Sequence, residues 1–361
     1  MTFVENHYWP DDHTIQISTD TSWEAFCSLT LEHVQGLPLF YPSHWTLNDI
    51  FSSDWPSIST GLGGRYPRDY VLGLSITDGA GVQTKAGGRV MKNVTGYDVC
   101  RLMVGSFTSL GTIHTLTLKL ITLPKRFTGY WFTFASQQQA LLFAYDILSN
   151  ITEALWACEV VSNQSVGTHN THRVFILASS EISPNVLKEP PTEVLTHQQA
   201  LVVAGQLSAF GWEAPPTTPI NPSVSSFLSG ILAVSLGHVS SAMERIERWL
   251  SSHSLERYQI QCRPAAGLVL FSVSFNEQRP EVDWLALLGH LQQLFPELQM
   301  QPKQASLRIT QWPACLTSAI NALHLPPPNT PEALYYRRLK QLYDSDNHFQ
   351  SPHLPLHLLN P

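Results

Sequence analysis

In the first part of the chain, hydrophobic residues alternate as in a strand and then recur every three to four residues as in a helix. Residues 13–18 alternate, which predicts a strand. The helix expected after them begins at a capping box formed by Thr21 and Glu24 and ends at Gly36. Its buried face has helical spacing and comprises Trp23, Phe26, Cys27, Thr30, Leu31 and Val34. Residues 37–56 are rich in Pro, Trp and Ser without any period, and this predicts a surface loop.

A hairpin and a short helix are expected next. Strands over 70–77 and 82–86 flank the turn Asp78-Gly79-Ala80-Gly81, whose glycines tolerate positive φ. Residues 98–104 are helix-like and are followed by Gly105, which is positioned to end the helix.

The last strand of this part is the most regular one. Residues 113–123 alternate, with Leu116, Leu118 and Leu120 on one face. His114 falls on the Leu116 face, so we expect it to be a half-buried structural residue. Pro124 closes the first predicted domain.

The rest of the chain alternates between strands and helices in a recurring order. Strand, helix, strand, strand, helix and strand are expected at 230–235, 241–251, 258–263, 268–275, 282–295 and 305–310. This β-α-β-β-α-β order is typical of a ferredoxin-like unit. Residues 128–210 begin in the same way, with helices from Ser136 and Thr196, so two such units are expected on either side of the Pro-rich linker 215–222. A final helix is expected over 331–343, before a Pro/His-rich tail.

Composition fits a globular α+β protein of two or three domains. The 361 residues are 43% hydrophobic and 14% charged, and the net charge of −7 disfavours a nucleic-acid binder. The five cysteines are far apart, which predicts free, buried thiols and no local zinc or iron–sulfur site. Because no apolar run is long enough to span a membrane and the start of the chain is acidic, we expect a cytoplasmic location.

Positive charge is concentrated in one segment. Residues 1–64 contain eight acidic residues and no Lys or Arg, whereas residues 65–126 contain nine basic and three acidic residues. The nine are Arg65, Arg68, Lys85, Arg89, Lys92, Arg101, Lys119, Lys125 and Arg126. This distribution indicates either a site for an anion, such as a cofactor diphosphate or a substrate carboxylate, or an ordinary solvated face.

One stretch carries a family resemblance. Residues 85–98 read K-A-G-G-R-V-M-K-N-V-T-G-Y-D, residues 67–73 read P-R-D-Y-V-L-G, and residues 105–111 read G-S-F-T-S-L-G. These motifs resemble those of the E-type, FAD-binding subunits of glycolate oxidases, in the flavoprotein superfamily typified by vanillyl-alcohol oxidase and p-cresol methylhydroxylase (PCMH). The resemblance is clear over 61–124 and fainter over 6–59 and the final helix.

The resemblance implies a PCMH-type FAD-binding domain over 1–124, an α+β cap domain with ferredoxin-like units over 125–330, and a C-terminal helix and tail over 331–361. It implies non-covalent FAD, oxidation of a small 2-hydroxy acid, and partnership with a D-type flavin subunit and an F-type iron–sulfur subunit. The cofactor-binding residues that it implies are Gly61, Gly63, Gly64, Arg65, Arg68, Lys92, Gly105, Ser106, Gly111 and Ile113. No catalytic residue is indicated. The tail histidines His348, His353 and His357 lie in a Pro-rich segment without a helical register or a carboxylate scaffold, so a solvated tail is expected rather than a metal site.

Three departures from the family pattern leave cofactor binding open. Relatives begin with a further subdomain that contains a diphosphate loop, so this chain is expected to be N-terminally shortened, or its first subdomain to be encoded before Met1. Asn48-Asp49 replaces a Gly-Gly pair, which places like charge near a diphosphate. Thr108 replaces a turn glycine, and β-branched residues resist positive φ. Two functions therefore compete: an FAD-containing redox subunit, and a flavin-free structural subunit that keeps the fold and its partner contacts.

Overall fold

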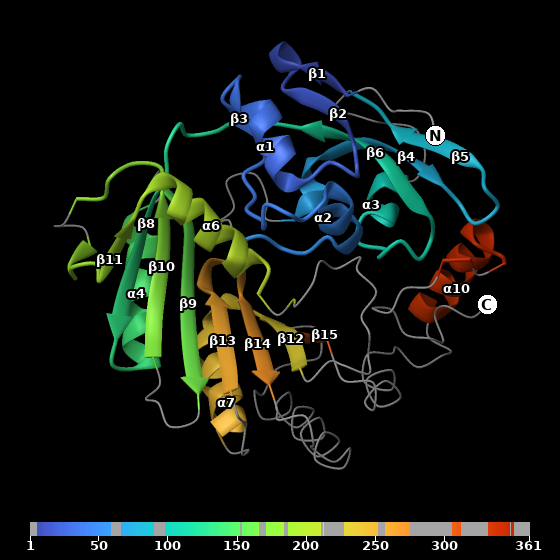
Figure 1. Cartoon of the computed structure of the whole chain (residues 1–361). Helices are drawn as coiled ribbons and strands as arrows, with labels where there is room; N and C mark the ends of the chain where they lie inside the picture. Colours follow the sequence, from blue (N-terminus) through green and yellow to red (C-terminus); the bar gives the residue numbers. More distant parts are fainter. Residues whose placement is uncertain are drawn as a thin grey trace. The chain divides into compact units, whose positions relative to one another are not determined.

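The chain forms two compact units, seen in a computed structural model (Figure 1). The first contains 1–125, 214–220 and 325–361, and the second contains 126–213 and 221–324. The last segment of the chain thus groups with the first. The described residues are 6–58, 66–89, 98–151, 154–165, 171–183, 187–210, 212, 227–251, 257–274, 305–311, 331–346, 348 and 349.

A five-stranded antiparallel sheet organises the first unit. Its order is β1-β2-β6-β4-β5, and its strands are β1 (His7–Trp9), β2 (Thr14–Ser18), β6 (Thr112–Lys119), β4 (Val71–Thr77) and β5 (Gln83–Gly87). A short separate pair joins β3 (Gln35–Gly36) to β7 (Ile121–Thr122). The helices are α1 (Trp23–Leu31), α2 (Leu47–Ser53), α3 (Val99–Met103) and α10 (Pro331–Tyr343). Short 3₁₀ turns cover Pro10–Asp12 and Pro67–Tyr70.

Several predictions for this unit are wrong in detail. Helix α1 is capped by Ser22, whose side chain accepts the Ala25 N–H, and it ends at Leu31, while Gly36 lies in β3. The buried face is narrower than expected, because Cys27 and Leu31 are exposed. The expected loop over 37–56 contains helix α2.

His114 is exposed, which contradicts its predicted half-burial. Ser75 pairs with Thr115 and Ile76 with Ile113, so a β-bulge inserts His114 between two paired residues. A bulge adds one residue to one strand and so changes the face on which the preceding residues lie. Ile113 is buried as a result, and the imidazole of His114 forms a 2.7 Å hydrogen bond with the Thr77 hydroxyl.

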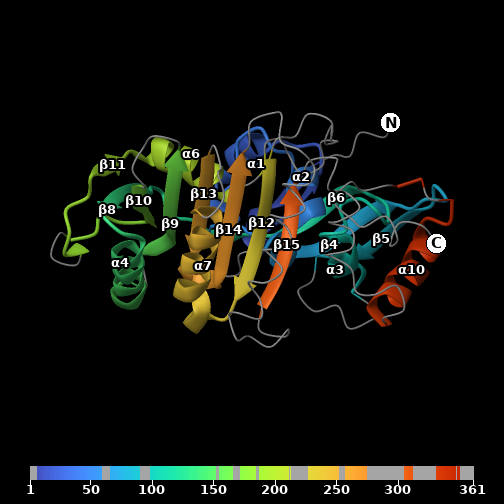
Figure 2. The same ribbon diagram turned by 90° about the horizontal axis from the view of Figure 1, so that it is seen from below.

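The second unit is built on an eight-stranded antiparallel sheet (Figure 2). The strands, in spatial order, are β11 (Glu193–Leu195), β8 (Thr128–Phe134), β10 (Thr171–Ala178), β9 (Leu155–Ser165), β13 (Arg257–Arg263), β14 (Leu268–Ser274), β12 (Phe227–Val234) and β15 (Ala305–Gln311). Its described helices are α4 (Gln137–Asn150), α6 (His197–Ser208) and α7 (Val239–Ser251), with 3₁₀ turns at Leu236–His238 and Pro264–Ala266.

Two four-stranded halves make up this sheet, and they meet where β9 pairs with β13. If the strands of each half are numbered along the chain, both halves have the spatial order 4-1-3-2, which is the arrangement that a β-α-β-β-α-β unit produces. The α+β class is therefore confirmed, and the two halves of the sheet have the same strand order. The predicted helix over 282–295 lies outside the described residues.

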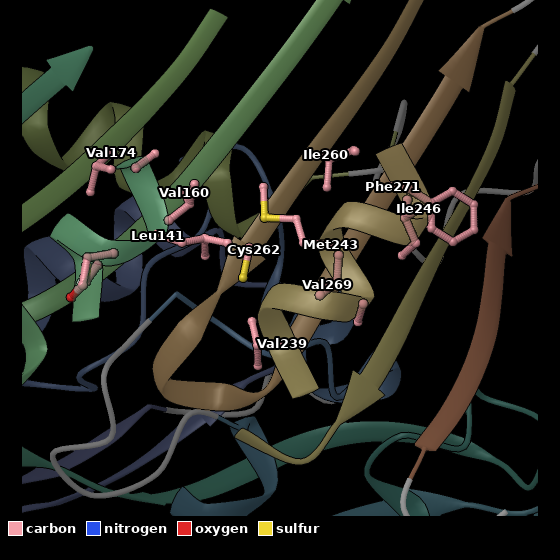
Figure 3. Close-up of a cluster of buried hydrophobic side chains, with 14 of the residues drawn as sticks. Leu141, Val160, Val174, Val239, Met243, Ile246, Ile260, Cys262, Val269 and Phe271 are labelled. Atoms are coloured by element: carbon pink, nitrogen blue, oxygen red, sulfur yellow. Dashed lines mark hydrogen bonds between the residues drawn. The ribbon is translucent and has the colours of Figure 1, made fainter. Parts of the chain in front are cut away.

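The core of this unit lies between one face of the sheet and helices α4 and α7. Figure 3 shows Leu141 of α4 and Met243 and Ile246 of α7 directed at strand residues that include Val160 and Phe271. Helix α6 packs on the opposite face. Its Ala200 lies so close to Gly129 of β8 that a Cβ atom added to Gly129 would be 3.0 Å from the Ala200 Cβ. Alternate strand residues thus face two different helix layers.

Candidate functional site

Residues 105–111, called here the glycine turn, follow α3 and lead into β6. Gly105 has φ +84° and Gly111 has φ +153°, values that favour glycine. Space also requires both glycines, since an added Cβ would lie 3.0 Å from the Asp54 Cβ at Gly105 and 2.7 Å from the Thr77 carbonyl oxygen at Gly111. Phe107 and Thr108 also have positive φ, at +51° and +60°. The turn therefore has a left-handed backbone at Thr108 although this residue is β-branched.

Most backbone N–H groups of the turn are already bonded within the protein. Gly105 donates to the Phe51 carbonyl at 3.0 Å and Phe107 to the Ser52 carbonyl at 2.8 Å, so the turn is joined to α2. The N–H groups of Ser106, Ser109 and Gly111 donate to carbonyls within 103–108. These five groups are not available to a diphosphate, and the two glycines serve the backbone conformation.

Ser106 is the residue of the turn whose side chain has an unmet hydrogen bond among the described residues. Its hydroxyl is buried and has no hydrogen-bond partner among the described residues. Buried polar groups normally have a partner, because an unmet hydrogen bond costs free energy. A hydroxyl in this state fits a carbonyl, ring nitrogen or phosphate oxygen of a bound cofactor.

Arg68 lies beside α2 and is bound to a carboxylate. One of its terminal nitrogens forms an ion pair with Asp54, and its backbone N–H donates to the same carboxylate at 2.9 Å. Burial raises the pKa of Asp54 to about 6, and the charge and hydrogen bonds of Arg68 lower it only in part. The Arg68 side chain is 44% exposed and its guanidinium lies 5.0 Å from the Tyr66 ring centre. Much of its charge is therefore balanced by Asp54.

Two further basic residues of the segment also have carboxylate neighbours. Arg89 faces Asp12 at 3.5 Å and stacks over the Trp9 ring, and Arg101 faces Asp98 at 3.5 Å. All four charged groups are about half exposed or more, so each pair contributes little to stability. The structure thus supports an ordinary solvated face at these two positions.

The remaining predicted positions divide into those that the structure describes and those that it does not. Ile113 is a buried residue of β6 opposite Ile76, and its carbonyl accepts the Thr19 hydroxyl at 2.7 Å. Gly61, Gly63, Gly64, Arg65 and Lys92 lie outside the described residues. The structure therefore brings Gly105, Ser106 and Gly111 together in one turn, with Arg68 linked to that turn through Asp54.

Asp49 has a structural role. Its carboxylate accepts the Thr46 N–H and the Thr46 hydroxyl, each at 2.7 Å, while the Thr46 oxygen accepts the Asp49 N–H. This reciprocal capping box begins α2, and it explains why Asp49 is buried although it carries a carboxyl group. The motif T-x-x-D at 46–49 could have identified this helix from the sequence.

The sequence did not indicate a second group of residues beside the turn, contributed by α10. Lys340 donates to the Ser109 carbonyl at 2.8 Å and forms an ion pair with Asp344, and the Tyr336 hydroxyl lies 2.5 Å from the Ser109 hydroxyl. Lys340 and Asp344 are fully buried. No motif reveals these contacts, since Lys340 is 231 residues from Ser109. A usable signal was the i,i+4 spacing of Lys340 and Asp344 in a predicted helix.

The second unit has its own buried polar group on the sheet face opposite α4 and α7. Glu159 of β9 accepts the Gln261 amide at 2.6 Å and lies 3.4 Å from the Arg263 Nε. Arg263 also donates to the Leu207 and Ser208 carbonyls at the end of α6. All three side chains are at least 98% buried, so this group ties the centre of the sheet to α6.

Within the described residues, no cluster of His, Cys, Asp or Glu could hold a metal ion. Cys100, Cys158 and Cys262 are free and buried thiols, as predicted, whereas the free thiol Cys27 is exposed, which contradicts its predicted burial. Cys315 lies outside the described residues. No helix among the described residues is long and apolar enough to cross a membrane.

Comparison with known proteins relates the chain to oxidases. Over 58 residues it is 50% identical to glycolate oxidase subunit GlcE of Escherichia coli (strain K12) and 41% identical to glycolate oxidase subunit GlcD of Bacillus subtilis (strain 168). Over a match of the same length it is 43% identical to D-lactate dehydrogenase of Anaerostipes hadrus. Each match covers 16% of this chain and only 12–17% of the relative. No family model matches the chain.

The fold comparison extends much further than the sequence comparison. Chitooligosaccharide oxidase superposes with a TM-score of 0.61 at 12% identity, over 95% of this chain and 78% of that protein. The chain has the fold of chitooligosaccharide oxidase. The resemblance to glycolate oxidase subunits is thus confirmed over a short segment, and the α+β oxidase fold over nearly the whole chain.

Proposed function

We propose that this chain is the FAD-binding subunit of a glycolate oxidase or dehydrogenase type complex that oxidises small 2-hydroxy acids. Its partners would be a D-type flavin subunit and an F-type iron–sulfur subunit. The observation that carries the proposal is the 50% identity to glycolate oxidase subunit GlcE over 58 residues. The oxidase fold supports it, because a local match on an unrelated fold would have little functional meaning.

The described residues fit part of a flavin site. FAD, when bound, would accept the hydride from the hydroxy-acid carbon, which is chemistry that the protein itself does not supply. Ser106 would donate a hydrogen bond to the cofactor, since its buried hydroxyl has no other partner among the described residues. Gly105 and Gly111 would shape the turn, and Arg68 would offer its exposed edge to an anionic group.

The direct test is flavin content. Purified protein should show the visible absorption bands of oxidised flavin, or acquire them on addition of FAD, and free flavin should be released on denaturation. A chain that stays colourless with excess FAD, alone and in the presence of the D-type and F-type subunits, would contradict the proposal.

Substitution of Ser106 tests the predicted contact. Ser106→Ala should weaken FAD binding about tenfold, because one hydrogen bond contributes roughly 0.5–1.5 kcal/mol. The free energy of unfolding without FAD should stay the same or rise, since the lost hydroxyl has no protein partner among the described residues. Titration of protein fluorescence with FAD measures the first quantity and urea unfolding the second. Ser75→Ala is a matched control, because its hydroxyl already bonds Thr115 at 2.6 Å within the sheet.

A second candidate is a flavin-free subunit that keeps the fold and its partner contacts. The observations that favour it are the internally bonded N–H groups of the glycine turn and the pairing of Arg68 with Asp54. This alternative predicts that the chain co-purifies with D-type and F-type subunits and that Arg68→Met and Lys92→Met leave the activity of the complex unchanged. Failure to co-purify with either subunit would remove its support.

A further inference from the structure

The glycine turn contains two adjacent residues in a backbone conformation that their side chains disfavour. Phe107 and Thr108 have φ +51° and +60°, in the left-handed region. A Cβ atom in this region crowds the following carbonyl oxygen, and β-branched residues such as Thr tolerate it worst. Such a conformation persists only where surrounding contacts enforce it. Contacts on both sides of the turn are therefore required.

On one side, α2 holds the turn through backbone hydrogen bonds. Gly105 and Phe107 donate to the carbonyls of Phe51 and Ser52 at 3.0 and 2.8 Å. These bonds fix the entry to the turn but do not reach beyond Phe107. The residues after Thr108 need another anchor.

On the other side, α10 holds Ser109, the residue directly after Thr108. The Lys340 ammonium donates to the Ser109 carbonyl at 2.8 Å. The Ser109 hydroxyl donates back to the Ser106 carbonyl, so the Tyr336 hydroxyl donates to the Ser109 oxygen. Ser109 is completely buried between these groups. Helix α10 thus fixes the exit from the left-handed pair.

The anchor on α10 is itself rigid. The three donors of Lys340 meet three acceptors, which are the Ser109 carbonyl, the Asp344 carboxylate and the Phe349 carbonyl. Asp344 also accepts the backbone N–H groups of His348 and Phe349, each at 2.8 Å. Burial alone would raise the pKa of Asp344, but the hydrogen bonds from Lys340, Phe349 and His348 outweigh it and lower the pKa.

The hairpin between β4 and β5 locks the end of α10 in place. Gly79 donates its N–H to the Tyr343 carbonyl at 2.6 Å, and a Cβ on Gly79 would lie 2.6 Å from the Asp344 Cα. Only glycine fits there. Lys340 and Asp344 are therefore fixed by contacts with three segments: helix α10, the hairpin between β4 and β5, and residues 348–349.

We propose that Tyr336, Lys340 and Asp344 form a positioning clasp that holds Phe107 and Thr108 in the left-handed conformation. The clasp acts through Ser109 and touches no cofactor itself. Its effect on flavin affinity rests on the proposed function, whereas its effect on the turn does not.

Hydrogen exchange of the full chain tests the clasp at the turn. Lys340→Met should speed exchange of the Ser109 and Gly111 amides, which donate to the Ser106 and Thr108 carbonyls, at least about tenfold, a change that corresponds to about 1.4 kcal/mol. Arg338→Met is the matched control, because it removes a cation from the exposed face of the same helix. It should leave both amides unchanged. Equal exchange in wild type and Lys340→Met would overturn the proposal.

Rescue by glycine separates positioning from general stabilisation. If the clasp offsets the strain of the left-handed conformation at Thr108, adding Thr108→Gly to Lys340→Met should restore most of the lost protection of the turn. Lack of rescue, with faster exchange throughout the first unit, would show that Lys340 only stabilises the unit and would overturn the proposal. If Lys340→Met does not fold, the same comparison is made with Tyr336→Phe, alone and combined with Thr108→Gly. Tyr336→Phe is the milder variant because it removes only one hydroxyl group.

Flavin binding gives an independent readout. When the wild type binds FAD, Lys340→Met should weaken binding at least about tenfold and Thr108→Gly should restore it, while Arg338→Met should have no effect. If FAD affinity is unchanged although the turn loosens, the clasp does not position a cofactor site. If the wild type binds no FAD, the proposed function fails, and the exchange experiment still decides on the clasp.

Discussion

The two units bury charged residues in different settings. In the second unit, Glu159 and Arg263 lie on neighbouring strands of a regular sheet, where pairing and alternation already place them side by side. In the first unit, Lys340 reaches Ser109 across 231 residues of sequence and meets it in an irregular turn. The second unit is thus specified by repeated patterns, whereas the candidate site of the first depends on a few individual side chains.

The largest effect is expected in the regular core of the second unit. Phe271→Ala should lower the free energy of unfolding by about 3–5 kcal/mol, because it leaves a cavity beside Trp249, whose ring centre lies 5.6 Å from that of Phe271. Leu142→Ala on α4 is the control, since this leucine is 63% exposed and should change stability by less than about 0.5 kcal/mol. Urea unfolding measures both. Similar losses in the two variants would mean that the apolar core does not dominate this unit.

A smaller effect, dependent on pH, is expected at Asp54. Burial raises its pKa from 3.8 to about 6, so the folded state binds this proton more tightly than the unfolded state. The protonated carboxyl group stabilises the folded state fully below about pH 4. This stabilisation, on the order of 3 kcal/mol, is lost as the pH rises from about 4 through about 6. Asp54→Asn cannot ionise and should lack this loss. The stability difference between the variant and the wild type should therefore grow in favour of Asn between pH 4 and 6, and a flat difference would contradict the raised pKa.

The smallest effect is expected at Thr108 in the otherwise unchanged chain. Relief of a left-handed β-branched residue gains about 1–2 kcal/mol, and the greater freedom of glycine in the unfolded chain offsets about half of it. Thr108→Gly should therefore stabilise the protein by about 0.5–1 kcal/mol in thermal or urea unfolding. Thr117→Gly, in the regular strand β6, should instead destabilise it. Stabilisation in neither variant would show that the turn carries little strain.

Most of the second unit could be predicted from the sequence because its signals are local. The helix caps Ser136 and Thr196 and the alternating strands gave both the elements and their order. In the first unit, α2 was missed because the Pro- and Trp-rich composition around it hid the capping box of Thr46 and Asp49. His114 was misplaced because a β-bulge leaves no trace in a simple alternating pattern.

The candidate site was predicted in outline only. The family motif drew attention to Gly105, Ser106 and Gly111, and the structure places them in one turn. It could not show that Asp54 balances Arg68 or that Lys340 binds Ser109, because those partners are distant in sequence and share no motif. The expectation that Thr108 resists positive φ was sound as physical chemistry, yet the turn adopts that conformation because neighbouring elements impose it.

The first unit combines residues from both ends of the sequence, and this fixes an order of events during biosynthesis. Helix α10 leaves the ribosome only after all of the second unit has been made. More than two hundred residues are therefore synthesised before Lys340 can donate its hydrogen bond to Ser109. Domains generally fold as they appear, and the second unit is therefore complete before the first can close. A chain truncated after residue 330 would therefore contain all eight strands of the second sheet, but its glycine turn would lack the contacts from α10.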